Sequence, residues 1–244
     1  MVWYYRKMSE FYHTYNRGVE KRKIFLDDKD YLRGVHDLYE FNDKSAVINF
    51  KQRFGKTSEV RIVGDPISNY LSNIKRPKEK LIDLLVWSFM PNHYHLFSTP
   101  IMEKGLSKFH QKFGIGFSSF FNTKYQRSGV LFQGKHKKVH VNNDKQVLQL
   151  ICYIHANPLD IWKPDWKEKG LTGSEVQGAL EFLEKEYRWS SHRDYLGIKN
   201  FPSLISTDFV LSFFNGPNVY REFFTDWLGQ YEKNKELIQK LTLE

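Results

Sequence analysis

Residues 81–98 constrain the fold of this chain more than any other segment. Two short runs, LIDLLVWSF and HYHLFS, have the length and composition of strands, and the turn-forming sequence MPN separates them. We therefore predict an antiparallel hairpin with strands over 81–89 and 93–98. Because side chains two residues apart in a strand point to the same side, His93 and His95 would project together from one face of the hairpin.

The segments on either side of this hairpin alternate between strand and helix patterns. The pattern is typical of strands over 11–17 and 138–142, whereas apolar residues recur at helical spacing over 28–41, 105–125 and 144–157. Up to residue 142, the order is strand–helix–strand–strand–helix–strand, which predicts an α+β ferredoxin-like sandwich with an antiparallel sheet. The helix that ends before Pro158 would be an addition to this core.

The composition indicates a globular protein that needs no disulfide framework. The chain has 244 residues, 41% of them hydrophobic, and a single cysteine, Cys152, which suits a reducing compartment. The longest apolar stretch, over 81–90, contains Asp83 and is too short to cross a bilayer. The first residues lack the continuous apolar segment of a secretory signal. We therefore expect a cytoplasmic protein with no membrane partner.

The charge of the chain is unevenly distributed. The formal net charge is +9, and the segment between residues 104 and 145 holds nine basic residues and one acidic residue. A clustered positive field attracts polyanions, of which nucleic acid is the commonest in a cytoplasm, although such a surface can also serve solubility alone. The candidate nucleic-acid-binding residues in this stretch are Lys104, Lys108, Lys112, Arg127, Lys135, His136, Lys137 and Lys138.

Two pairs of residues carry possible chemistry. His93 and His95 have a spacing suited to one divalent metal ion, but two imidazoles are an incomplete site, and a histidine pair on a strand is more often structural. Tyr153 and Asn157 lie one helical turn apart and share a face. A tyrosine hydroxyl is a nucleophile only when a nearby cation assists it, and an amide oxygen can ligate a metal. The alternative is that Tyr153 packs in the core and Asn157 caps the helix.

Taken together, these segments resemble the IS200-type single-tyrosine (Y1, HUH) transposases, and among them the REP-associated tyrosine transposases. The resemblance rests on MPNHYHL, GVLFQGKHKKVHV and YIHANPLD, on the opening YHTYNRGVEKRKIFLDDKDYL, and on YRWSSHRDYLG at 187–197. Tyr94 is a mild departure, because the family has a hydrophobic residue between the two histidines. Residues 198–244 match no part of the family pattern.

The resemblance implies a DNA transposition enzyme that cleaves single-stranded DNA at hairpin or palindromic sites and transfers the strand. Tyr153 would be the catalytic nucleophile and would form a 5′-phosphotyrosine link. His93, His95 and Asn157 would hold Mg²⁺ or Mn²⁺. Because phosphotyrosine conserves the bond energy, no nucleotide cofactor is implied. The enzyme would act as a monomer or homodimer, associated with DNA in the cytoplasm.

We expect residues 1–160 to form the HUH/Y1 catalytic domain, with 43–80 as a loop or insertion. Residues 161–244 would form a mainly helical extension packed on it. Two other functions remain open at this point. One is a non-catalytic or domesticated protein that binds single-stranded or hairpin nucleic acid. The other is a metal hydrolase that uses a bound water and does not need Tyr153.

Overall fold

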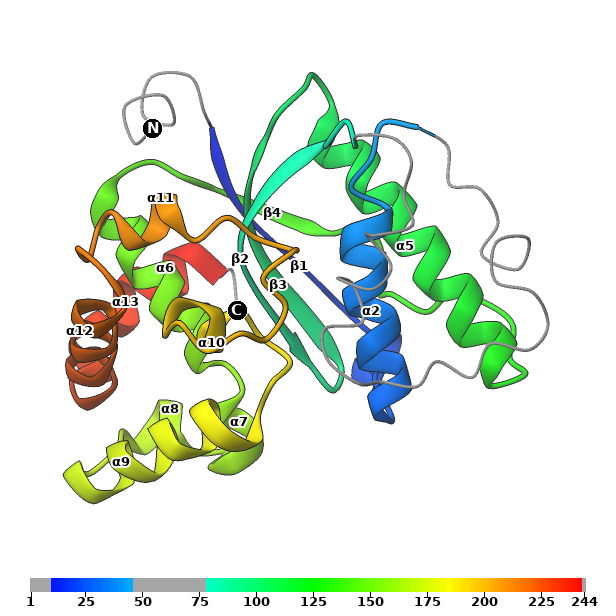
Figure 1. The fold of residues 1–244 in the computed structure, drawn as a ribbon. Helices are drawn as coiled ribbons and strands as arrows, with labels where there is room; N and C mark the ends of the chain where they lie inside the picture. The colour runs from blue at the N-terminus through cyan, green and yellow to red at the C-terminus, as the bar shows by residue number, and fades with distance from the viewer. Residues whose placement is uncertain (1–9, 46–77, 243–244) are drawn as a thin grey trace.

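A four-stranded antiparallel sheet lies at the centre of the computed structural model, which describes residues 10–45 and 78–242 (Figure 1). The strands are β1 (Phe11–Arg17), β2 (Ile82–Met90), β3 (His93–Pro100) and β4 (Lys137–Val141), in the spatial order β2-β3-β1-β4. Helix α2 (Asp28–Glu40) connects β1 to β2, and α5 (Gly105–Lys124) connects β3 to β4. This is the predicted α+β architecture, with every neighbouring pair antiparallel.

Helices α2 and α5 cover one face of the sheet (Figure 1). Helix α2 begins with a capping box, in which the Asp30 backbone amide donates to the Asp27 side chain and the Asp27 backbone amide donates to the Asp30 side chain. Gly34 allows the close approach of α2 to the sheet, because a Cβ atom there would lie 2.7 Å from the Phe89 ring. A stripe of Phe side chains buries α5 against the same layer.

Helix α6 (Asp144–Ala156) covers the opposite face, so the structure has three layers (Figure 1). Most of its residues from Val147 onward are buried, as expected for a helix held between the sheet and other helices. A short 3-10 helix (Val19–Lys21) follows β1, and the helices after α6 gather on the same side of the sheet as α6 (Figure 1). They are α7 (Leu159–Trp162), α8 (Trp166–Lys169), α9 (Gly173–Glu181), a π-helix (Phe182–Glu186), α10 (His192–Tyr195), α11 (Asp208–Leu211), α12 (Pro217–Gly229) and α13 (Tyr231–Thr242).

A buried polar network ties α6 to this C-terminal layer. The Tyr220 hydroxyl lies 2.7 Å from His155 Nδ1 and 2.7 Å from His192 Nδ1, and His155 Nε2 lies 2.8 Å from Ser191 Oγ. The His155 ring therefore contacts the C-terminal layer, and the neighbouring Cys152 is also buried. These hydrogen bonds satisfy polar groups that would otherwise be costly to bury.

The C-terminal layer also protects one edge of the sheet. Along β2, the Phe89 amide donates to the carbonyl of Trp189 at 2.9 Å, and the Ser191 amide donates to the carbonyl of Trp87 at 3.0 Å. The segment around Trp189 thus takes the position of a short fifth strand beside β2. An unprotected edge would present unpaired amides and carbonyls to other chains.

The predicted elements and the structure agree to within one or two residues at most ends. The helix predicted over 28–41 ends at Glu40, and Asn157 is the C-cap of α6 and not its last helical residue. Of the expected loop over 43–80, residues 46–77 lie outside the described residues. Its two ends meet, because the Lys44 amide donates to the carbonyl of Glu79 at 2.8 Å. None of the described helices is both long and apolar enough to cross a membrane.

Candidate nucleophile and metal site

Strands β1 and β3 place three histidine rings together on the face covered by α6. In the register of these strands, Arg17 lies opposite His93 and Tyr15 lies opposite His95. The ring centroids of His93 and His95 are 4.9 Å apart with the rings nearly perpendicular, and those of His13 and His95 are 5.1 Å apart in a stacked arrangement. All three histidines are buried. The predicted pair therefore projects from one face, as strand alternation requires.

Helix α6 brings Tyr153 and Asn157 to these histidines across about sixty residues of sequence. The Tyr153 ring lies 5.6 Å from the His95 ring, edge to face, and 6.5 Å from the His13 ring. The Asn157 amide donates to the carbonyl of Tyr153 at 3.0 Å, so the two residues lie one turn apart. The Asn157 side chain is close enough to His93 to raise the pKa of that imidazole, against larger opposing effects.

Lys167, on α8, adds a positive charge that no motif in the sequence indicates. Its Nζ lies 5.3 Å from the centroid of the Tyr153 ring, 3.4 Å from Asn157 Oδ1 and 2.8 Å from Asp160 Oδ2. The neighbouring Trp166 is buried and donates to Asp160 Oδ1 at 2.7 Å, which anchors the short helix. Lys167 belongs to no motif, and only the packing of α8 beside α6 identifies it.

His13 is the second residue that motif reasoning missed. Its Nε2 lies 2.9 Å from His95 Nδ1, and its Nδ1 lies 2.8 Å from the carbonyl oxygen of Leu241 on α13. A signal was present in the sequence, since His13 falls in a predicted strand with the same period-two alternation as the histidine pair. The pairing of that strand with β3 could not be read from the alternation alone.

Burial keeps all three imidazoles neutral at pH 7. Burial lowers the pKa of His13 to about 4, and burial together with the positive charges of Arg17 and Lys167 lowers the pKa of His93 to about 3. Burial, then His93 and His13, holds the pKa of His95 well below its ordinary value. A neutral imidazole has a lone pair on one nitrogen and can bind a metal through it.

The donor groups present fit a divalent metal ion only in part. In 10–45 and 78–242, no three His, Cys, Asp or Glu side chains gather in an arrangement that could hold a metal. The available donors are the imidazoles of His93 and His95 and the amide oxygen of Asn157. Mg²⁺ prefers oxygen ligands, so the two imidazoles suit Mn²⁺ somewhat better. They supply no negative charge, so an anionic ligand such as a phosphate would have to complete the site.

The predicted nucleic-acid-binding residues fall into two groups, and the first lies on or beside α5, in the layer opposite Tyr153. Lys104 and Lys108 are exposed to solvent. Lys112 is half-buried and donates to the carbonyls of Asp43 and Ser45. Arg127 donates to Asn122 Oδ1 at 2.7 Å and to the carbonyl of Val130 at 3.3 Å. Lys112 and Arg127 therefore also have structural partners.

The second group lies on and before β4, next to the histidines. Lys135, Lys137 and Lys138 are exposed, and the His136 ring stacks on His110 with centroids 3.9 Å apart. Lys137 pairs with Tyr15 in the sheet and so points to the face that carries His95. Lys138 points to the other face, where its Nζ lies 4.4 Å from the Tyr12 ring centroid. Of the predicted cations, Lys137 is thus on the same sheet face as the candidate site.

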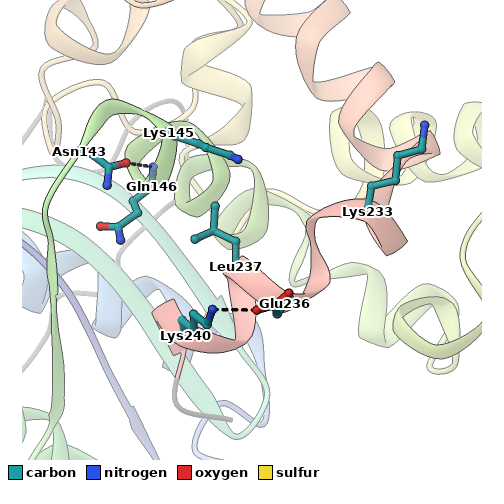
Figure 2. Close-up of a pocket in the computed structure, with 7 residues that line it drawn as sticks. All are labelled: Asn143, Lys145, Gln146, Lys233, Glu236, Leu237 and Lys240. Atoms are coloured by element: carbon teal, nitrogen blue, oxygen red, sulfur yellow. Dashed lines mark hydrogen bonds and ion pairs between the residues drawn. The ribbon is translucent and has the colours of Figure 1, made fainter.

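A surface hollow of about 270 Å³ lies elsewhere, between the start of α6 and α13 (Figure 2). Two polar contacts join residues that line this hollow. The Gln146 backbone amide donates to Asn143 Oδ1 at 2.9 Å, and Lys240 forms an ion pair with Glu236 at 2.8 Å. None of the predicted site residues lines it. The histidine site itself is closed, since Tyr153 is only 2% exposed and His95 is fully buried.

Neither a protein-family model nor a curated protein matches the sequence. Among solved structures, the chain is similar to one described as "Structure of the REP associates tyrosine transposase bound to a REP hairpin". The TM-score is 0.41 and the identity 12%, with 82% of this chain and 87% of that chain covered. At this level of similarity, only the side chains of the site can support a functional assignment.

Proposed function

We propose that the protein is a metal-dependent DNA strand transferase in which Tyr153 attacks a phosphate of single-stranded DNA. One observation carries the proposal: the Tyr153 ring lies 5.6 Å from the ring of His95, within a cluster that also contains His93 and Asn157. The four residues come from the two sequence motifs that resemble the single-tyrosine transposases.

In this reaction the Tyr153 hydroxyl loses its proton and its oxygen forms a bond to phosphorus. The bond from phosphorus to the 3′ oxygen breaks, and that oxygen takes up a proton to become a free 3′-OH. The product is a 5′-phosphotyrosine, and attack by another 3′-OH reverses the step and joins strands. Lys167 supports the forward step, because its ammonium lies 5.3 Å from the ring of Tyr153 and favours a negative charge there.

A metal ion would be held by His93, His95 and Asn157 and would withdraw charge from a non-bridging phosphate oxygen. The side chains of the chain itself orient the substrate. Arg17 is partly buried opposite His93, and Lys137 is exposed on the same sheet face, so both are placed to contact the DNA backbone near the site. Exposed Lys104 and Lys108 would contact phosphates farther along the strand.

The site is closed, which limits how DNA could reach Tyr153. The Tyr153 side chain is 2% exposed, and the candidate ligands are covered by α6 and the C-terminal layer. We therefore propose that residues 1–160 carry the nucleophile and the metal ligands, and that part of 161–244 is displaced when DNA binds. We infer a hairpin or palindromic substrate from the motif resemblance.

Covalent trapping tests this proposal. The full-length protein is incubated with labelled single-stranded hairpin DNAs and Mn²⁺ or Mg²⁺, and adducts are resolved on a denaturing gel. We expect a metal-dependent adduct that Tyr153→Phe and His93→Ala abolish. The matched control is Tyr12→Phe, which makes the same chemical change on the other face of β1, where the hydroxyl contacts Glu10. This variant should form adduct like the unmodified protein.

Either of two results would refute the proposal and favour another function. DNA binding without adduct or cleavage over a broad hairpin library would favour a protein that only binds nucleic acid, which the burial of Tyr153 would then explain. Cleavage that persists in Tyr153→Phe would point to a hydrolase that activates water.

A further inference from the structure

A chain of hydrogen bonds links the last turn of α13 to the candidate metal ligand His95. The carbonyl oxygen of Leu241 lies 2.8 Å from His13 Nδ1, and His13 Nε2 lies 2.9 Å from His95 Nδ1. His13 and His95 are both fully buried and their rings stack. The three groups belong to α13, β1 and β3, so the chain crosses from the C-terminal layer into the sheet.

The chemistry of these groups determines where the protons lie. A carbonyl oxygen can only accept a hydrogen bond, so the Nδ1 of His13 must carry the proton of that contact. A fully buried imidazole is neutral and has one N–H, which leaves a lone pair on His13 Nε2. The short contact between the two rings then requires His95 Nδ1 to donate its proton to His13 Nε2. His95 therefore carries its lone pair on Nε2.

The tautomer of His93 is determined in the same way, by different residues. Its Nδ1 lies 2.6 Å from Asn92 Oδ1. The orientation of the Asn92 amide is itself fixed, because its Nδ2 donates to the carbonyl of Lys21 at 3.2 Å. An amide oxygen accepts, so His93 also carries its proton on Nδ1 and its lone pair on Nε2. Two independent hydrogen-bond chains, each ending in a backbone carbonyl, thus give the two imidazoles the same tautomer.

We propose that His13 is a positioning residue that holds His95 in the Nδ1–H tautomer, with the Leu241 carbonyl as its anchor. The inference rests on the proposed function, in which His95 binds the metal through Nε2. Metal-binding histidines commonly have their second nitrogen fixed in this way, and loss of that partner weakens metal binding by about 10–100-fold. Here the partner is a second histidine, itself oriented by the C-terminal helix.

The first test measures the tautomers directly in the metal-free protein. Full-length protein labelled with ¹⁵N-histidine is examined by long-range ¹H–¹⁵N correlation spectra at pH 7.5, and the ring signals are assigned with His95→Asn and His93→Asn. We expect both imidazoles as Nδ1–H tautomers. An Nε2–H tautomer for His95 would overturn the proposal, whatever the protein does with DNA.

The second test compares His13→Phe with His13→Gln. Phenylalanine keeps a ring in the stack but cannot accept a proton, whereas the glutamine amide oxygen can reach the position of His13 Nε2. By Mn²⁺ titration calorimetry, we expect His13→Phe to bind about tenfold more weakly or worse, and His13→Gln within about threefold of the unmodified protein. The His93 tautomer should be unchanged in both. Equal affinities in the two variants would overturn the proposal.

The two tests separate this inference from the proposed function. If the unmodified protein does not bind Mn²⁺, the proposed metal site is wrong. The spectra of the metal-free protein then still test whether His13 holds His95 in the Nδ1–H tautomer. If His13→Phe does not fold, the tautomer spectrum and the His13→Gln titration remain. The proposal would be contradicted if His13→Gln bound Mn²⁺ as weakly as a variant that lacks the His95 imidazole.

Discussion

Six buried neutral histidines make the stability of this fold sensitive to mild acid. Burial is the main cause that lowers the pKa of each, to about 4 for His13 and about 3 for His93 and His192, and well below the ordinary value for the other three. The six are His13, His93, His95, His110, His155 and His192. In the unfolded chain each would titrate near its ordinary pKa of 6.5.

The sign and size of the effect follow from proton linkage. The pKa of each histidine is lower in the folded state than in the unfolded state, so below about pH 6.5 the unfolded state binds more protons than the folded state. The free energy of unfolding therefore falls as the pH is lowered through this range. At pH 5.5 the folded histidines remain neutral, so the loss depends only on the unfolded pKa and is about 1.4 kcal/mol for each histidine. Six such groups lose about 8 kcal/mol, comparable with the whole stability of a typical domain.

The assay is urea unfolding followed by circular dichroism at several pH values between 7.5 and 5.5, without added metal. We expect unfolding to take up about five protons near pH 5.5, and the protein to unfold without denaturant near pH 5. His192→Asn should lower this uptake by about one proton. An uptake below about two protons would refute the reasoning, since the buried histidines would then be charged in the folded state.

Three further predictions concern the site. Lys167→Met should slow adduct formation roughly tenfold, because a partly screened ammonium 5.3 Å from the Tyr153 ring contributes on the order of 1 kcal/mol; quenched-flow gels at one pH would measure it. Lys137→Ala should weaken DNA binding and make the slope of log binding constant against log salt concentration shallower by about one. Lys185→Ala, which removes a partner of Glu181, should leave that slope unchanged. Mn²⁺ should bind at least about tenfold more tightly in the presence of single-stranded DNA, as calorimetry would show, because the donor set lacks a negative ligand.

The sequence was sufficient to predict the strands of the sheet and the α+β architecture. Period-two alternation and the turn sequence MPN define β2 and β3, and strand pairing follows from the order of elements. The proximity of His95 and Tyr153 was predictable only from the family resemblance, because no local pattern states which helix covers which face. Their ring distance of 5.6 Å depends on how α6 crosses the sheet.

Lys167 and the Leu241 carbonyl could not be predicted. Lys167 follows a break at Pro164 and lies in a four-residue helix whose place is fixed by the burial of Trp166 and its bond to Asp160. Backbone carbonyls carry no sequence signal at all, so the contact from Leu241 to His13 is visible only in the folded chain. The loop ends around Lys44 and Glu79 show the same limit, since their pairing spans 35 residues.

The C-terminal layer contributes to the site in three separate ways, which makes it more than a cover. It supplies the ammonium of Lys167 beside Asn157, the carbonyl of Leu241 that orients His13, and the segment at Trp189 that pairs with β2. A chain that ended at residue 160 would keep every residue of the recognised motifs for metal and nucleophile. It would nevertheless lose the fixed proton on His95 and expose the edge of β2, which carries the turn leading to His93. The same layer that covers the site therefore also orients the imidazoles. In the proposed reaction, DNA would displace part of this layer while the contact at Leu241 is kept.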